Sequence, residues 1–179
     1  MLYIRPVGVV DETLLNEVRE DLGVSLRIRV KILPPMPIPE GSFEGSRNQY
    51  HSTKILREMV REIPADAAKL LGLIDKDLCI PILTFVFGEA QLGGPASIVS
   101  LARLRQEFHG LPPDRGILYE RLYKECLHEL GHNYGLVHCS DRDCAMYLSN
   151  TVVDVDRKKA AYCRSCGVTL RGAIGPRKE

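Results

Sequence analysis

The feature that most constrains this 179-residue chain is a run of closely spaced histidines. His128, His132 and His138 lie within eleven positions, although the whole sequence has only five histidines. His128 and His132 are four residues apart, so on a helix both rings emerge from one face, one turn apart. Two imidazoles placed in this way can reach one tetrahedral zinc ion. The run therefore predicts a helix that carries metal ligands.

A turn at Gly135 is expected to complete this site. Glycine adopts the left-handed conformation that ends a helix and turns the chain, which would bring His138 back as a third ligand. Three protein ligands leave one position for water, which distinguishes a catalytic zinc site from a structural one. Glu129 follows the first ligand directly and is placed to act as general base on that water without binding the metal.

The alternative is that these histidines are ordinary core or surface residues. Chance supplies the five fixed residues of the extended pattern in roughly one chain in 100,000, which argues against that alternative. His51 and His109 stand outside any such pattern, and we interpret them as residues that bind no metal. The sequence thus predicts a catalytic zinc site formed by His128, His132, His138 and Glu129.

Composition bounds the class of protein. Hydrophobic residues make up 45% and charged residues 26% of the chain, which suits one folded core. The formal net charge is +1, so the overall charge does not favour a nucleic-acid or membrane partner. The basic stretches Arg157-Lys158-Lys159 and 171–179 are expected to be solvated surface, the second a flexible tail. No run approaches the roughly 20 apolar residues of a membrane span, and the N-terminus is unlike a signal peptide. We expect a cytoplasmic monomer.

Four of the six cysteines indicate a second metal site. Thiols stay reduced in the cytoplasm, so cysteines there suggest metal binding before disulfides. Cys-x-x-Cys-Gly has the shape of a zinc knuckle, and four thiolates would make a closed structural site. A redox pair, disulfides or a zinc-ribbon module that binds nucleic acid are the alternatives. Cys79 and Cys126 are interpreted as core thiols. The predicted ligands are Cys139, Cys144, Cys163 and Cys166.

Hydrophobic patterning predicts that strands and helices alternate before the histidines. Strands are expected at 2–10, 25–33, 80–87 and 96–104, and helices at 11–23, 52–62, 65–71 and 111–134. The run 80–87 is continuously apolar, which is typical of a strand buried on both faces. The predicted fold is α/β (α+β): a compact domain with a mixed twisted sheet, an active-site helix and a loop-rich, zinc-stabilised C-terminal part. We expect one domain, 1–179, divided into 1–134, 135–170 and the tail 171–179.

These motifs together resemble the archaemetzincin family of metallopeptidases. The resemblance rests on the histidine run and on His138-Cys139, Cys144-Ala145-Met146 and Cys163-Arg164-Ser165-Cys166. Segments 85–90 and 99–104 are also similar to that family, so the likeness is strong over about residues 80–166 and looser before. It implies a metzincin-like domain with two zinc ions, one catalytic and one structural. It also implies that Met146 is the Met-turn residue, an apolar floor beneath the zinc-binding histidines.

The function that follows is zinc-dependent hydrolysis of a peptide or protein substrate. In related metzincins an extended peptide pairs with an edge strand above the helix, and we expect the strand near 96–104 to be that edge. The enzyme would be an aminopeptidase or another peptidase of narrow specificity. Two alternatives stay open: a zinc-binding regulatory module with little activity, and a hydrolase of a non-peptide amide. The intact Glu129 favours an enzyme.

Overall fold

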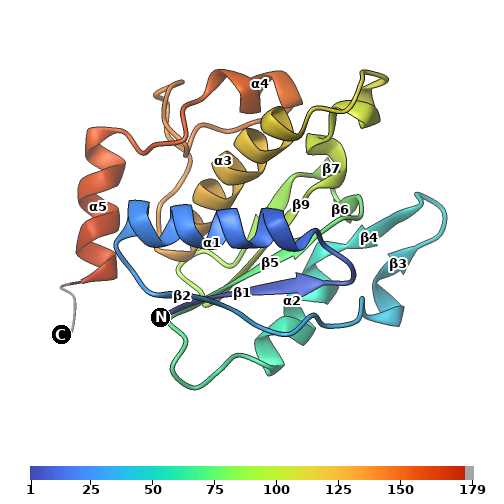
Figure 1. The fold of residues 1–179 in the computed structure, drawn as a ribbon, viewed down its shortest axis with the longest axis horizontal. Coiled ribbons are helices and arrows are strands. Elements are labelled where there is room, and N and C mark those ends of the chain that lie inside the picture. Colours follow the sequence, from blue (N-terminus) through green and yellow to red (C-terminus); the bar gives the residue numbers. More distant parts are fainter. Residues whose placement is uncertain (176–179) are drawn as a thin grey trace.

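A mixed five-stranded sheet with helices on both faces forms the centre of the computed structural model, which describes residues 1–175 (Figure 1). The strand order is β2-β1-β5-β9-β8. The first four strands are parallel, and β8 runs antiparallel to β9 at one edge. The strands are β1 (Leu2–Val7), β2 (Val30–Ile32), β5 (Lys69–Ile74), β9 (Ala96–Ser100) and β8 (Gly88–Ala90).

Helices α1 (Glu12–Leu26) and α3 (Arg115–Asn133) cover one face of this sheet, and α2 (Ser52–Arg61) covers the other (Figure 1). Side chains alternate between the faces of a strand, so β5 contributes to both cores. Its Leu71 and Leu73 lie in the cluster with α1 and α3, and its Leu70 and Ile74 lie in the cluster with α2. A strand buried on both faces is apolar at almost every position, as this one is.

A smaller sheet lies beside the first and has the order β3-β4-β6-β7. Its strands are β3 (Phe43–Glu44), β4 (Gln49–His51), β6 (Leu78–Ile80) and β7 (Leu83–Val86). Short 3-10 helices η1 (Glu40–Ser42), η2 (Ala102–Leu104) and η3 (Gln106–His109) connect the elements.

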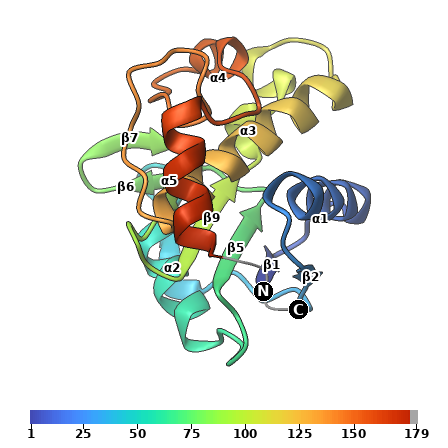
Figure 2. The same cartoon turned by 90° about the vertical axis from the view of Figure 1, so that its left-hand side faces the viewer.

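The C-terminal part contains α4 (Val152–Arg157) and α5 (Arg164–Ile174), which lie toward α3 in Figure 2. Arg121 of α3 holds α4 in place: its guanidinium donates to both carboxylate oxygens of Asp156, at 2.7 and 2.8 Å. The expected tail 171–179 falls partly within α5, and residues 176–179 lie outside the described residues.

Three predicted boundaries differ around the first helix and its neighbour. The helix does not stop at Gly23; it runs to Leu26, and Arg27 takes the left-handed conformation with φ 54°. The extra turn buries Leu26 one turn beyond Leu22. Because Ser25 and Leu26 belong to the helix, the strand expected at 25–33 shrinks to Val30–Ile32.

Two further predictions were wrong because tertiary context overrode local preference. The helix expected at 65–71 is absent, and that segment leads into β5, the central strand. The single strand expected at 80–87 is a hairpin of β6 and β7, and Ile82 at its turn is 85% exposed. The predicted α/β class, the long helix before Gly135 and the burial of Cys79 and Cys126 are confirmed. Within residues 1–175, no helix combines the length and apolar character needed to cross a membrane.

Candidate active site

Helix α3 carries the first two histidines into the interior. The helix begins after Asp114, whose carboxylate accepts a hydrogen bond from the Ile117 N–H at 2.9 Å, as an N-cap residue does. Its other end is tied to the sheet, because the Asn133 amide donates to the Ala96 carbonyl at 2.8 Å. His128 is therefore held in a rigid, almost fully buried position, with 6% of its surface exposed.

Hydrogen bonds orient the rings of His128 and His132. The Nδ1 atom of His128 lies 2.8 Å from the Ala145 carbonyl, and the Nδ1 atom of His132 lies 2.8 Å from the Leu136 carbonyl. Carbonyl oxygens only accept, so both Nδ1 atoms donate and both Nε2 atoms carry lone pairs. The two Nε2 atoms are 3.1 Å apart. A cation between two lone pairs at this distance would remove their repulsion.

The turn after α3 brings the third histidine to the same place. Gly135 has φ +88°, in the left-handed region, and its N–H donates to the His132 carbonyl at 2.9 Å. The ring of His138 consequently lies 5.3 Å from that of His128 and 4.9 Å from that of His132, between centroids. The bend predicted from the sequence is present in the structure.

The three imidazoles fit a zinc ion. One ring nitrogen of each lies within 4.8 Å of the others. Two nitrogens bound to one tetrahedral zinc at 2.0–2.1 Å stand about 3.3 Å apart, close to the observed separation of His128 and His132. Burial lowers the pKa of His128 to about 2 and also lowers the pKa of His132 and of His138. All three rings are therefore neutral near pH 7, as metal ligands must be.

Glu129 lies beside the histidines with its carboxylate buried. Burial raises its pKa well above the ordinary value, and the neighbouring Glu125 raises it further. A methyl group added at Gly88 of β8 would stand 2.6 Å from the Glu129 Oε1 atom. The backbone of β8 therefore passes directly over this carboxylate.

The site opens into a cleft of about 520 Å³ between α3 and the edge of the larger sheet. Gly88, Glu89 and Ala90 of β8 line it, together with β7 and residues Leu148 to Asn150. This corrects one prediction: β9 is not the edge strand, because β8 pairs with it on that side. The strand that borders the cleft is β8, which was not predicted.

A buried ion pair adjoins the cleft and was missed by the sequence analysis. Lys158, which was expected to be solvated, has no exposed side-chain surface, and its Nζ atom lies 2.7 Å from Glu125 Oε1. Glu125 stands one turn before Glu129 on α3 and lines the cleft. The four-residue spacing of Glu125 and Glu129 could have indicated from the sequence that Glu125 faces the site. The burial of Lys158 could not be predicted in this way, because it depends on the path of the chain after α4.

Met146 lies beneath the histidine helix. Its side chain is fully buried and packs directly on Gly131, where a larger residue would collide with the sulfur. Its carbonyl accepts a hydrogen bond from the Cys139 N–H at 2.9 Å. This bond joins the two segments that carry the third histidine and the first cysteines.

The four cysteines predicted to bind metal gather in one cluster. The sulfurs of Cys139, Cys144, Cys163 and Cys166 lie within 4.8 Å of one another. Cys139 Sγ is 3.9 Å from Cys163 Sγ. A disulfide needs about 2.05 Å, whereas two sulfurs on one tetrahedral zinc stand about 3.8 Å apart. A backbone N–H donated by Cys166 lowers the pKa of Cys163, while burial raises the pKa of Cys144 and of Cys166.

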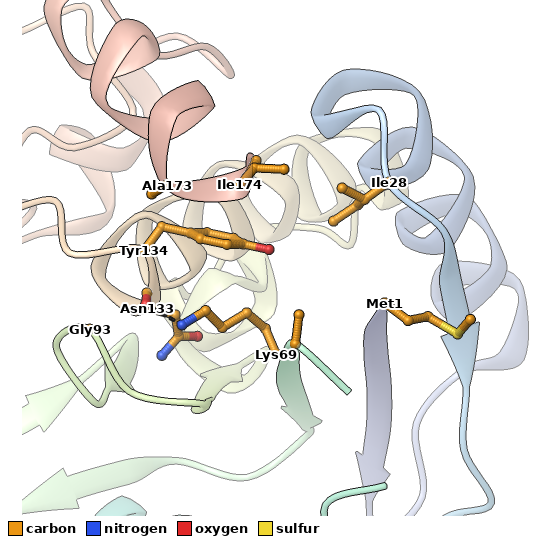
Figure 3. A pocket seen from close by; sticks show the side chains of 9 residues that line it. Met1, Ile28, Lys69, Gly93, Asn133, Tyr134, Ala173 and Ile174 are labelled. Atoms are coloured by element: carbon orange, nitrogen blue, oxygen red, sulfur yellow. Dashed lines mark hydrogen bonds between the residues drawn. The ribbon is translucent and has the colours of Figure 1, made fainter. Parts of the chain in front are cut away.

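A second cavity, of about 390 Å³, lies behind the end of α3 (Figure 3). Lys69 points into it toward Tyr134, with Nζ 5.0 Å from the ring centre. The same ammonium already donates to the carbonyls of Gly94 and Asn133, at 2.9 and 2.6 Å. Its role is to fix the helix end to the sheet. Among the described residues, His51 and His109 lie outside both the histidine cluster and the cysteine cluster.

A cluster of three histidines opens into the cleft, with two of them and an adjacent glutamate on a helix that faces the open edge of a mixed sheet. This arrangement defines a zinc metallopeptidase. Comparison with known proteins supplies the family. The model of peptidase family M54 matches residues 8–172. The chain belongs to this family, the archaemetzincins, as the resemblance implied.

Relatives match over almost the whole chain. The archaemetzincin of Methanocaldococcus jannaschii is 41% identical over 165 residues, which cover 92% of this chain and 89% of that protein. The crystal structure of the Methanopyrus kandleri archaemetzincin has a TM-score of 0.85 at 34% identity, and the match covers 97% and 95% of the two chains. That of Archaeoglobus fulgidus, in complex with malonate, has a TM-score of 0.81 at 36% identity, covering 94% and 98%.

Proposed function

We propose that this chain hydrolyses peptide bonds with a zinc ion held by His128, His132 and His138, and with Glu129 as general base. One observation carries the proposal: three neutral imidazoles converge on one point, and the buried carboxylate of Glu129 lies beside them without a hydrogen bond to any of the three rings. When bound there, zinc acidifies a water molecule and polarises the carbonyl group of the substrate.

Glu129 supplies the proton transfers. Its carboxylate accepts a proton from the attacking water and then gives it to the leaving nitrogen of the peptide bond. The raised pKa of Glu129 suits both roles. It brings the proton affinity of the carboxylate closer to the proton affinities of the attacking water and the leaving nitrogen. The hydrogen bonds at Nδ1 of His128 and His132 keep the ligand rings in place throughout.

The substrate is proposed to lie along β8. In the described part of the chain, this strand pairs with β9 on one side and borders the cleft on the other. An extended peptide can hydrogen-bond to such an edge, and Gly88 places this strand next to Glu129. A cleft of about 520 Å³ accommodates few residues, which favours an aminopeptidase or another peptidase of narrow specificity. We further propose that the protein is a monomer in the cytoplasm, because reducing conditions there preserve the cysteine thiols.

A second, structural zinc is proposed for the four cysteines. Their sulfur separation supports it, as do the N–H groups of Met146 and Cys163, which donate to the Cys144 sulfur at 3.5 and 3.3 Å. This ion would join the segment after α3 to the start of α5. Met146 is proposed as the Met-turn residue, because it packs under the helix turn between the two histidines.

The test is Glu129→Ala, with Glu120→Ala as the control. Glu120 is exposed on the same helix. We expect the Glu129→Ala protein to retain its zinc and lose hydrolysis of a peptide library, whereas Glu120→Ala keeps both. An unchanged rate in Glu129→Ala would contradict the mechanism. A zinc-loaded wild type that binds peptides without cleaving them would favour a zinc-binding regulatory module. Cleavage confined to non-peptide amides would favour a hydrolase of such amides.

A further inference from the structure

The carboxylate of Glu125 lies in the cleft beside the zinc site but has no part in the mechanism above. Glu125 and Glu129 are four residues apart on α3 and so share one helix face. Only 3% of the Glu125 side chain is exposed, and the residue lines the same cleft as His128 and Glu129. A buried carboxylate next to a reactive centre needs a partner or a purpose.

Lys158 satisfies only part of that carboxylate. Its Nζ atom lies 2.7 Å from Oε1, and its own side chain is fully buried and is not part of the cleft lining. Among residues 1–175, no group donates a hydrogen bond to the second oxygen, Oε2, and this oxygen is not one of the fully buried atoms that lack a partner. Oε2 is therefore the oxygen that is open to the cleft. A carboxylate can accept about four hydrogen bonds, so a donor that enters the cleft can bind to it.

The charges around the cleft indicate which donor fits. Its lining includes Glu89, Glu125 and Glu129, and among the described residues it includes no lysine or arginine. Lys158 pairs with Glu125 but does not line the cleft, so the carboxylate is the member of the ion pair that faces it. Hydrogen bonds from a cationic donor to a carboxylate are roughly twice as strong as those between neutral groups.

We propose that Glu125, positioned by Lys158, binds a cationic nitrogen of the substrate next to the scissile bond and so makes the enzyme selective for cationic peptides. This inference rests on the proposed peptidase function. The nitrogen is an ammonium or guanidinium group, either the free N-terminus of the peptide or a lysine or arginine side chain. The rim beyond Glu125 is apolar, with Leu83, Leu92, Val137 and Leu148 partly exposed, and would hold the neighbouring side chains.

The experiment compares short peptides that differ in one charge. Each lysine peptide is paired with its norleucine counterpart, and each is made with a free and with an acetylated N-terminus. We expect the zinc-loaded wild type to favour cationic peptides by at least about tenfold in kcat/KM. In Glu125→Gln this ratio should fall toward one, whereas Glu120→Gln should keep it. Sensitivity to acetylation assigns the N-terminus as the bound cation, and sensitivity to norleucine assigns the side chain.

A second variant tests whether a lost preference results from misfolding. Glu125→Gln leaves Lys158 buried without a counter-charge, so the double variant Glu125→Gln with Lys158→Met removes both charges and keeps similar volumes. It should melt near the wild-type temperature and show no preference for cationic peptides. An undiminished preference in this variant, or no preference in the wild type, overturns the inference.

A binding measurement separates this inference from the peptidase function. The same peptide pairs are titrated by calorimetry into the Glu129→Ala protein, with and without Glu125→Gln. A cation preference in Kd that depends on Glu125 supports the inference, whether or not the wild type cleaves these peptides. Failure of the zinc-loaded wild type to cleave any peptide, alongside that preference, would count against the peptidase function alone. Cleavage without any charge preference would do the reverse.

Discussion

Gly88 and Glu129 approach each other closely in the lining of the cleft: a methyl group at Gly88 would stand 2.6 Å from the Glu129 carboxylate and 2.7 Å from the Ile98 carbonyl. The first contact joins the edge strand to the proposed general base. The second is to backbone, so the strand cannot retreat without breaking its pairing with β9. The position of the base thus depends on the absence of a side chain at residue 88.

Gly88→Ala should therefore displace the Glu129 carboxylate and lower peptide hydrolysis while zinc stays bound. Small misplacements of a reacting group cost on the order of tenfold to a hundredfold in rate, and we expect a loss of kcat/KM in that range. Gly172→Ala is the control, because an added methyl group there meets nothing within 4 Å. Full activity in Gly88→Ala, measured on the zinc-loaded protein, would show that the contact does not constrain the base.

Gly135→Ala should weaken zinc binding through the backbone alone. An added methyl group meets no atom within 4 Å, but φ is +88°, which costs an L-residue about 1–2 kcal/mol. Relaxation of that strain moves His138 away from the other ligands. Gly110→Ala imposes a similar strain, at φ +74°, in a segment that carries none of the three proposed zinc ligands. In chelator titrations we expect Gly135→Ala to lose zinc more readily than wild type, with Gly110→Ala unchanged; equal behaviour of the two variants would refute this.

Cys163→Ser should release one zinc ion per chain and leave the other in place. Loss of a thiolate opens the proposed four-sulfur site and loosens the connection between the segment after α3 and α5. We expect metal analysis to show about one equivalent fewer than wild type, with a lower melting temperature. Cys79→Ala is the control, since this buried thiol lies outside the cluster and should change stability without changing zinc content. Unchanged zinc in Cys163→Ser would argue against a structural zinc.

The histidine site was predictable because its geometry is local. Positions 128 and 132 share a helix face by periodicity, and Gly135 permits a turn that few other residues allow. The cysteine cluster was likewise predictable from spacing. The long helix was also predicted, from 111, although it begins only after the cap at Asp114. The two histidines and the glycine are close in sequence, and the cysteines carry a recognisable Cys-x-x-Cys motif.

The cleft was not predictable, because its walls come from distant segments. β8 is three residues long and borders the site only because it pairs with β9. β9 in turn pairs with β5, whose first residues were predicted to belong to a helix at 65–71. Likewise, nothing near Lys158 in the sequence indicates burial. Its partner Glu125 is 33 positions away and meets it only because α4 packs on α3.

The most direct test of the account is the zinc content and activity of His138→Ala, compared with His109→Ala. His138 is the ligand that reaches the site only through the turn at Gly135, whereas His109 lies outside it and contacts the Arg103 carbonyl. We predict that His138→Ala loses about one equivalent of zinc and all measurable peptide hydrolysis, while His109→Ala keeps both. A His138→Ala protein with its full zinc content and undiminished hydrolysis would contradict the proposal that these three histidines hold the catalytic metal.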